Sequence, residues 1–306
     1  MILQTKRLIL RPWREEDGEE LYRYASSPEV GPAAGWPAHT SVEESREIIR
    51  TVLSAPETYA VCLKEDGLPI GSVGFHRNDL AEEEDEYELG YWIGKPFWGQ
   101  GLIPEAAREM LRHAFLDLGM RRIWCGYYEG NQKSRRVQDK LGFSYHHTTE
   151  GIELPLLGET RTGHAMLLTR AAFSVLHLTE LCEGAPVDLP EVERFLKAAR
   201  PAPEEITLAA YRLLEKLEWE KSVFRYEHGR EAEPYELATE DFPRLFRLFA
   251  EYGLSETVTV MNSDGGESVY SILEMLSWLD NEEAGRRCIG ALLDLGFDPD
   301  LLSEEA

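Results

Sequence analysis

The sequence predicts a mixed α/β (α+β) domain followed by an acidic domain of helices. Strand-like and helix-like stretches alternate from the N-terminus to about residue 170, whereas the remainder shows only helical spacing. The charge also divides unevenly. Residues 1–174 carry 20 basic and 27 acidic side chains, net −7, and residues 175–306 carry 12 and 29, net −17. At ~100–200 residues per domain, the 306 residues divide into two domains, 1–174 and 175–306.

Local signals place the elements of the first domain in order. Residues 6–13 alternate apolar and polar side chains, as a half-buried strand does. Ser41 and Glu44 form a capping box, which predicts a helix start, and Glu-Asp-Gly at 65–67 is a hairpin turn signal. We predict helices over 15–25, from 41 onward, over 104–118 and over 131–141, and strands over 6–13, 58–64, 69–76, 87–93, 122–128, 143–149 and 162–169, with the last apolar strand-like stretch ending near 175.

The second domain shows helical spacing at 192–199, 204–220, 241–252, 269–279 and 282–295, so we predict an all-α domain. Two of its helix ends resemble each other, at 245–257 and 288–300, and each stops at a glycine, Gly253 or Gly296. The pair resembles a divergent ankyrin-like helical stack, a type of fold that binds protein partners on extended faces. The alternative is an irregular helical domain with two ordinary helix ends.

The formal net charge of −24 excludes two classes of partner. Non-specific nucleic-acid binding and binding to anionic membranes both depend on basic side chains, so we expect neither. No apolar run approaches the ~18 residues of a membrane span, and the N-terminus lacks signal-peptide architecture. We therefore expect a globular protein in the cytoplasm.

Cysteine and histidine patterns give no sign of a disulfide scaffold or a metal site. The four cysteines are scattered without a CxxC pair, which is typical of free thiols in a reducing compartment: Cys62, Cys125, Cys182 and Cys288. The adjacent histidines His146 and His147 are expected to point to opposite faces of a strand. We therefore expect no metal.

The stretch from residue 88 to residue 106 is the most informative in the chain. A strand ends near Gly94, and the loop Trp98-Gly99-Gln100-Gly101 then opens a helix with Pro104 in its first turn, where proline is favoured. Glycines allow the backbone to approach a ligand, and the free N–H groups of a helix start favour an anion such as a phosphate.

This stretch resembles the acetyl-CoA-binding motif of the GCN5-related N-acetyltransferase (GNAT) family, and more narrowly the subgroup of ribosomal-protein alanine acetyltransferases. Three other segments match that subgroup in order: Thr5 to Trp13 its opening strand, Asn131 to Val137 its Asn-x-x-Ser helix start, and Lys140 to Phe143 its exit into a strand. The resemblance covers about residues 1–172 and does not extend into residues 176–306.

The resemblance implies a mostly antiparallel sheet, flanked by helices and splayed between two central strands, with acetyl-CoA in the splay. It implies direct transfer of an acetyl group from the thioester to a primary amine. The last position of the glycine motif is usually Gly or Ala and is Ile103 here. The implied acetyl-CoA contacts are Trp92, Ile93, Trp98, Gly99, Gln100, Gly101, Leu102, Ile103, Asn131 and Ser134.

Many relatives place a tyrosine late in the second motif helix to protonate the departing thiolate, and the matching residue here is Gln138. Within the subgroup, the resemblance implies that Ser134 takes this role. Alternatively, Ser134 satisfies backbone N–H groups at the helix start. Asn131 is implied to bind the pantetheine arm, and it also suits a helix cap. Tyr87 and Tyr128 are further candidates for the proton donor.

Glu88 begins the central strand beside the thioester and is the candidate general base, acting through water; its alternative is one more surface acid after residues 82–86. Trp92 and Phe97 also suit a core or wall position. The loop at 35–39 lies where the family shapes its acceptor pocket. The expected acceptor-binding residues are Trp13, Trp36, His39 and His76.

The resemblance and the sequence patterns together leave two functions open, of which the resemblance implies the first. The first is an acetyl-CoA-dependent N-acetyltransferase that acts on a protein N-terminus or a small-molecule amine. The second is a catalytically weak scaffold that senses acetyl-CoA or binds proteins through its helical domain. In either case, the net charge of −17 on residues 175–306 would attract a cationic acceptor or a basic protein partner by electrostatic steering.

Overall fold

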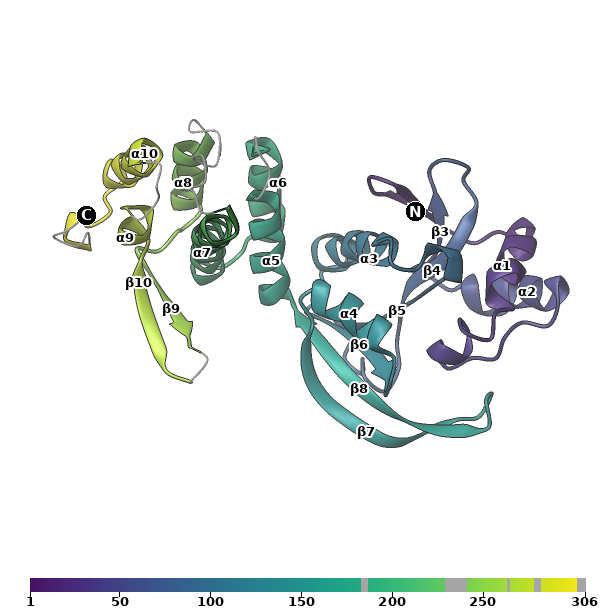
Figure 1. Ribbon diagram of the computed structural model, residues 1–306. Helices are drawn as coiled ribbons and strands as arrows, with labels where there is room; N and C mark the ends of the chain where they lie inside the picture. Colours follow the sequence, from purple (N-terminus) through teal and green to yellow (C-terminus); the bar gives the residue numbers. More distant parts are fainter. Residues whose placement is uncertain (183–186, 229–240, 263–264, 278–281, 302–306) are drawn as a thin grey trace. The chain divides into compact units, whose positions relative to one another are not determined.

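A computed structural model of the protein describes residues 1–182, 187–228, 241–262, 265–277 and 282–301. The chain forms two compact units, Met1–Arg170 and Ala171–Ala306 (Figure 1). Within the described ranges, none of the helices combines the length and the apolar character that a bilayer crossing needs.

The N-terminal unit is built around an eight-stranded sheet with strand order β1-β2-β3-β4-β5-β6-β8-β7. Each neighbouring pair is antiparallel except β5 and β6, which are parallel. The mostly antiparallel mixed sheet that the family resemblance implies is thereby confirmed. The strands are β1 (Leu3–Gln4), β2 (Leu8–Arg11), β3 (Thr58–Leu63), β4 (Pro69–His76), β5 (Glu86–Ile93), β6 (Arg122–Tyr128), β7 (Ser144–Leu154) and β8 (Glu159–Thr169).

Helices cover both sides of this sheet. Figure 1 shows α1 and α2 on one side of the central strands and α3 and α4 on the other. Helix α1 packs on β4, α3 packs on β2, β4 and β5, and α4 packs on β6. The helices are α1 (Gly18–Ala25), α2 (Val42–Ile48), α3 (Leu102–Arg112) and α4 (Gln132–Lys140), and π-helical turns at Ile49–Leu53 and His113–Asp117 extend α2 and α3.

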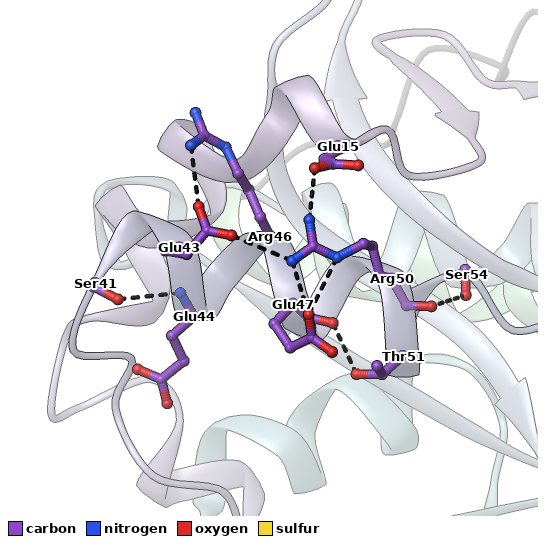
Figure 2. A network of polar contacts seen from close by, with 9 residues as sticks. All are labelled: Glu15, Ser41, Glu43, Glu44, Arg46, Glu47, Arg50, Thr51 and Ser54. Atoms are coloured by element: carbon purple, nitrogen blue, oxygen red, sulfur yellow. Dashed lines mark hydrogen bonds and ion pairs between the residues drawn. The ribbon is translucent and has the colours of Figure 1, made fainter.

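Most of the local signals act as predicted. Ser41 Oγ accepts the backbone N–H of Glu44 at 3.1 Å and so caps α2 (Figure 2). The Glu44 carboxylate, however, accepts from the N–H of Thr40 at 2.6 Å, one residue earlier than a capping box predicts. Gly67 has a φ of +72°, which allows the tight turn that joins β3 to β4.

An enclosed ion pair fixes the connection from β2 into α1. Arg11 Nη1 and Nη2 each lie 2.7 Å from a carboxylate oxygen of Asp17, and the two side chains are 10% and 9% exposed. Asp17 also accepts the backbone N–H of Arg14 at 2.9 Å. The bidentate geometry therefore holds a charged pair inside the fold with its hydrogen bonds satisfied.

The C-terminal unit is helical, with one exception to the all-α prediction. A two-stranded antiparallel hairpin, β9 (Thr257–Met261) with β10 (Glu267–Ser271), lies between α8 and α9 (Figure 1). The helix predicted from residue 269 therefore begins only at residue 272, because Val269 and Tyr270 favour a strand and pair with the β-branched run at 257–260. The helices are α5 (Arg170–Cys182), α6 (Leu189–Ala199), α7 (Pro203–His228), α8 (Asp241–Glu251), α9 (Ile272–Ser277) and α10 (Glu282–Leu293).

The start of α5 is a second correction. Residues 170–175 were expected to continue a strand, yet the chain becomes helical at Arg170, directly after β8. Ala171 and Ala172, which have the highest helix propensity, lie in its first turn. The apolar run alone did not distinguish a strand from a buried helix.

The two predicted glycine stops of this unit are confirmed. Gly253 and Gly296 have φ of +105° and +94°, in the left-handed region. In each case the glycine N–H bonds to the carbonyl three residues back, and the next residue bonds to the carbonyl five back, at 2.9 Å for Leu254 and 3.2 Å for Phe297. This is the Schellman pattern of helix termination. The ankyrin-like interpretation of the segment stays a prediction.

We expected His146 and His147 to point to opposite faces of the strand, and this prediction is wrong. The register of β7 on β8 shifts between Tyr145 and His147, and the two imidazoles lie side by side with their Nδ1 atoms 2.8 Å apart. A bulge adds one residue to a strand and so breaks the alternation of its side chains. Within the described ranges, His, Cys, Asp and Glu side chains form no group of three suited to hold a metal.

Candidate active site

The two central parallel strands separate after a short shared stretch. β5 and β6 pair at Glu86 with Arg122, Tyr87 with Ile123 and Glu88 with Trp124, and at no later position of these fully described strands. Beyond that point β5 stays paired with β4 as far as Ile93, and β6 stays paired with β8 as far as Tyr128. The edge of β5 from residue 89 to residue 93 therefore offers backbone groups to a ligand.

A glycine loop follows the open end of β5. Gly99 and Gly101 have φ of +78° and +72°, and Gly101 is the N-cap of α3. A Cβ at Gly99 would meet no atom within 4 Å, so the loop backbone is open on that side. The first N–H groups of a helix have no intrahelical partner, so this start suits an anion. Pro104 lies in the first turn, as predicted.

The loop is held in place by Arg7, which directly precedes β2, and by the end of β5. Arg7 Nη1 donates to Gln100 O at 3.0 Å, and Arg7 is in turn paired with Glu105 of α3 at 2.6 Å. Trp98 Nε1 donates to Ile93 O at 3.0 Å. These bonds fix the loop before any ligand arrives.

Asn131 and Ser134 lie at the start of α4, and the structure separates their roles. Asn131 Oδ1 accepts the N–H of Ser134 at 3.2 Å, so Asn131 is the helix cap, while its Nδ2 donates to Ala33 O at 3.2 Å. Ser134 Oγ contacts side chains instead of capping the helix. It lies 3.0 Å from the hydroxyl of Tyr91 and 3.1 Å from Nε2 of Gln138.

Sequence reasoning missed Tyr91 and gave Gln138 only as the place of a missing tyrosine. Gln138 is fully buried, and its Nε2 also donates to Gly126 O at 3.0 Å. Burial raises the pKa of Tyr91 well above its usual 10, so the phenol stays neutral. The spacing of Ser134 and Gln138, four residues apart on one helix face, was the available signal.

Glu88 is not a solvated surface acid, unlike the exposed Glu82, Glu83 and Glu84. Its half-buried carboxylate accepts hydrogen bonds from the Asn78 side chain and from the backbone of Gly126. Burial, which outweighs these bonds, raises its pKa above the ordinary value. A Cβ at Gly126 would lie 3.1 Å from Glu88 Oε1, so glycine leaves room for this carboxylate. The N–H of Gly126 thus faces Glu88, and its carbonyl accepts from Gln138.

The four expected acceptor residues divide into two groups. Trp13 and His39 are buried: Trp13 Nε1 donates to Ser72 at 3.1 Å, and His39 Nδ1 lies 2.8 Å from Ser45 Oγ, with a pKa lowered by burial. They support the fold from within. Trp36 is only partly buried and packs edge-on against Trp92 with centroids 5.9 Å apart.

His76 is exposed and lies across β4–β5 from Glu88 in register, on the same face of the sheet. Its ring covers Gly90, where a Cβ would come within 3.0 Å of it. The loop around Gly35 reaches the end of β6, since a Cβ at Gly35 would lie 3.0 Å from the Tyr128 hydroxyl. His76, Glu88, Trp36 and Tyr128 therefore belong to one face beside the splay.

Comparisons with known proteins agree with this geometry. Residues 7–144 match the model of the acetyltransferase (GNAT) domain. The chain is 31% identical over 146 residues to the uncharacterized N-acetyltransferase p20 of Bacillus licheniformis, which covers 46% of this chain and 81% of that protein. The chain belongs to the GNAT acetyltransferase family.

Other GNAT proteins extend the picture. A ribosomal-protein-serine acetyltransferase of Escherichia coli (strain K12) is 29% identical over 113 residues, 35% of this chain and 62% of its own. A GNAT acetyltransferase from Bacillus anthracis shares the fold with a TM-score of 0.50 at 22% identity, over 55% of this chain and 98% of its own. As a GNAT protein, the chain is an acyltransferase of the acetyl-CoA-dependent N-acetyltransferase class, and the splayed strands and open glycine loop fit that co-substrate.

Proposed function

We propose that this protein transfers the acetyl group of acetyl-CoA directly to a primary amine, on a protein N-terminus or on a small molecule. The observation that carries the proposal is that a carboxylate and a hydrogen-bonded hydroxyl group approach the two sides of one residue, Gly126, beside the splay of β5 and β6. Glu88 lies on its N–H side, and the Gln138–Ser134 pair lies on its carbonyl side. Direct transfer needs a base for the amine and a donor for the thiolate close together.

The residues divide the work as follows. The loop amides from Trp98 to Ile103 bind the pyrophosphate, and the free edge of β5 at Trp92 and Ile93 binds the pantetheine amides. The side-chain amide of Asn131 forms a further hydrogen bond with the same pantetheine arm. Its cap is compatible with this role, because an amide side chain carries both acceptor and donor groups.

Glu88 accepts the proton that the amine loses, directly or through one water. The raised pKa of Glu88 lies closer to physiological pH than the pKa of an ordinary carboxylate, and this makes Glu88 a stronger base. Ser134 directs its hydroxyl hydrogen to the thiolate. In the acceptor pocket, Trp36, Trp92 and His76 contact the amine substrate, while Trp13 and His39 stabilise the wall behind them.

Two measurements on the full chain test the proposal. Isothermal titration with acetyl-CoA should show saturable binding, and incubation with a panel of amines should release free CoA thiol. Replacing Glu88 by Gln serves as the matched variant, because it keeps the side-chain shape and removes the base. A folded protein that binds no acetyl-CoA contradicts the proposal.

A second function is favoured by one observation, the glutamine at the usual position of the tyrosine acid. In this alternative the protein is a weak catalyst that senses acetyl-CoA or binds a basic protein through its C-terminal unit. Binding of acetyl-CoA without thiol release by any amine would support it. We further propose that the protein acts in the cytoplasm, because its four cysteines are scattered along the sequence without a CxxC pair, which is typical of a reducing compartment.

The acidic C-terminal unit is proposed to attract a cationic acceptor or partner. Its net charge of −17 would raise the local concentration of such a molecule, an effect that salt suppresses. The KM of an amine that carries additional positive charges should therefore rise with ionic strength more steeply than the KM of an amine whose other groups are uncharged. Equal salt dependence for the two substrates contradicts steering.

A further inference from the structure

Three side chains beside the splay are joined by hydrogen bonds: Tyr91 on β5, and Ser134 and Gln138 on α4. Gln138 Nε2 donates its two hydrogens to Gly126 O at 3.0 Å and Ser134 Oγ at 3.1 Å. Both partners accept, so the amide can be oriented only with its nitrogen toward them. Ser134 Oγ therefore already accepts one bond, and its own hydrogen remains to be placed.

Tyr91 on β5 is the third member of this group. Its hydroxyl lies 3.0 Å from Ser134 Oγ and 3.2 Å from Ser134 O, close enough to donate to either. When the hydrogen of Ser134 points to an external acceptor, Tyr91 can donate to the vacated lone pair of Oγ. The arrangement forms a chain of two hydroxyl groups that leads from the protein interior to Ser134.

The chemistry of the leaving group requires such a chain. Thiols titrate near 8.5 and phenols near 10, whereas a serine hydroxyl is not a titrating group in proteins. Ser134 can pass a proton to a thiolate only if it regains one at the same time. The phenol of Tyr91 is the acid in direct contact with Ser134 Oγ, and although burial raises its pKa, it has to give up its proton only as Ser134 loses one to the thiolate.

We propose that Tyr91 is the proton source behind Ser134, a role that rests on the acetyl transfer proposed above. As the thioester C–S bond breaks and the N–C bond forms, Ser134 gives its hydroxyl proton to the sulfur and takes the proton of Tyr91. The electron pair of the Tyr91 O–H bond stays on the phenolate oxygen, which water then reprotonates. Tyr91 acts through Ser134 and is in this sense a positioning residue.

The groups that face Tyr91 suit a brief phenolate. Gln138 Nε2 lies 3.5 Å from the Tyr91 oxygen, and the Cys125 thiol is a second neighbour. Burial holds the pKa of Cys125 well above its usual range, so this thiol stays protonated. No fixed negative charge therefore opposes the phenolate from Cys125, Ser134 or Gln138.

The experiment begins with the wild-type chain and an amine that it acetylates. Tyr91→Phe should lower kcat by about 100-fold, at the lower end of the ~10²–10⁴ range for proton transfer catalysts, with the KM for acetyl-CoA within about twofold. Tyr91→Phe combined with Ser134→Ala should be no slower than Ser134→Ala alone, because the two act in one chain. Tyr59→Phe on β3 is the matched control, since it removes a tyrosine hydroxyl of the same sheet that donates to Glu57 instead of Ser134, and it should leave kcat unchanged.

Fluorinated tyrosine at position 91 separates proton transfer from a structural role. It keeps the ring and the hydroxyl, so the variant folds, but lowers the phenol pKa. At one neutral pH, kcat should rise along a series of tyrosines with increasing fluorination, because a more acidic phenol gives its proton to Ser134 more readily. A kcat that does not respond to the acidity of the phenol, or a Tyr91→Phe enzyme with wild-type kcat, overturns the role of Tyr91 alone. A wild-type chain that releases no CoA with any amine overturns the proposed function and this role with it.

Discussion

The ion pair between Arg11 and Asp17 gives the strongest prediction for stability. Asp17→Asn keeps the side-chain shape but leaves the guanidinium of Arg11 buried without a counter-charge. Losing one partner of a buried pair costs about 3–5 kcal/mol. With a urea dependence of about 2 kcal/mol/M for a unit of this size, the midpoint of unfolding should fall by about 1.5–2.5 M.

The assay is urea unfolding followed by tryptophan fluorescence, since Trp13 lies two residues from Arg11 and is buried in the same unit. Arg11→Met added to Asp17→Asn should recover most of the loss, because it removes the uncompensated charge. A midpoint lowered by less than about 0.5 M would refute the reasoning. So would a double variant that is no more stable than the single one.

The exposed network around Arg50 provides the contrast (Figure 2). Its guanidinium contacts Glu15 at 2.6 Å, Glu43 at 3.2 Å and Glu47 at 2.7 Å, and its side chain is 39% exposed. Exposed ion pairs are screened by solvent and contribute little net stability. Arg50→Gln should therefore leave the urea midpoint almost unchanged although it breaks more contacts than Asp17→Asn. A loss equal to that of Asp17→Asn would show that burial does not decide the effect.

Three further predictions concern the site and the thiols. Ser134→Ala should lower kcat while the Kd of acetyl-CoA, measured by calorimetry, stays the same; unchanged turnover would reject Ser134 as the donor. In the wild type, kcat/KM should fall as the pH drops through the raised pKa of Glu88, because only the carboxylate is a base, and Glu88→Gln should be slow at every pH without this acid limb. The thiols of the native protein should react very slowly with a thiol reagent, since all four cysteines are buried and burial raises the pKa of Cys62 to about 11 and of Cys288 to about 12. In denaturant, all four cysteines should become reactive. A native thiol that reacts at the denatured rate would contradict the burial.

Signals that act over a few residues gave most of the fold. The turn at Gly67, the cap at Ser41 and the stops at Gly253 and Gly296 each depend on neighbours within five residues, so the sequence contains them completely. The family resemblance added the splay, which no local pattern predicts. The helix at Arg170 and the hairpin after α8 were missed because a short apolar run suits a strand or a helix equally well.

The site was predictable in its parts but not in its connections. Ser134, Glu88 and Asn131 follow from motif positions, yet the contact of Tyr91 with Ser134 joins residues 43 apart in the sequence. Such a contact depends on the register of β5 and the tilt of α4, which are tertiary properties. His39 and Trp13 show the opposite error, since a polar or aromatic residue near a pocket can equally be part of its supporting core.

Gly126 carries a consequence for how the enzyme could change. Its N–H faces the carboxylate of Glu88, the proposed base, and its carbonyl accepts from Gln138, which also donates to the proposed donor Ser134. Any side chain introduced at this residue would displace Glu88 first. Under the proposed roles, substitutions in the loop around Trp36 can therefore alter the acceptor pocket without disturbing this arrangement, whereas a substitution of Gly126 cannot.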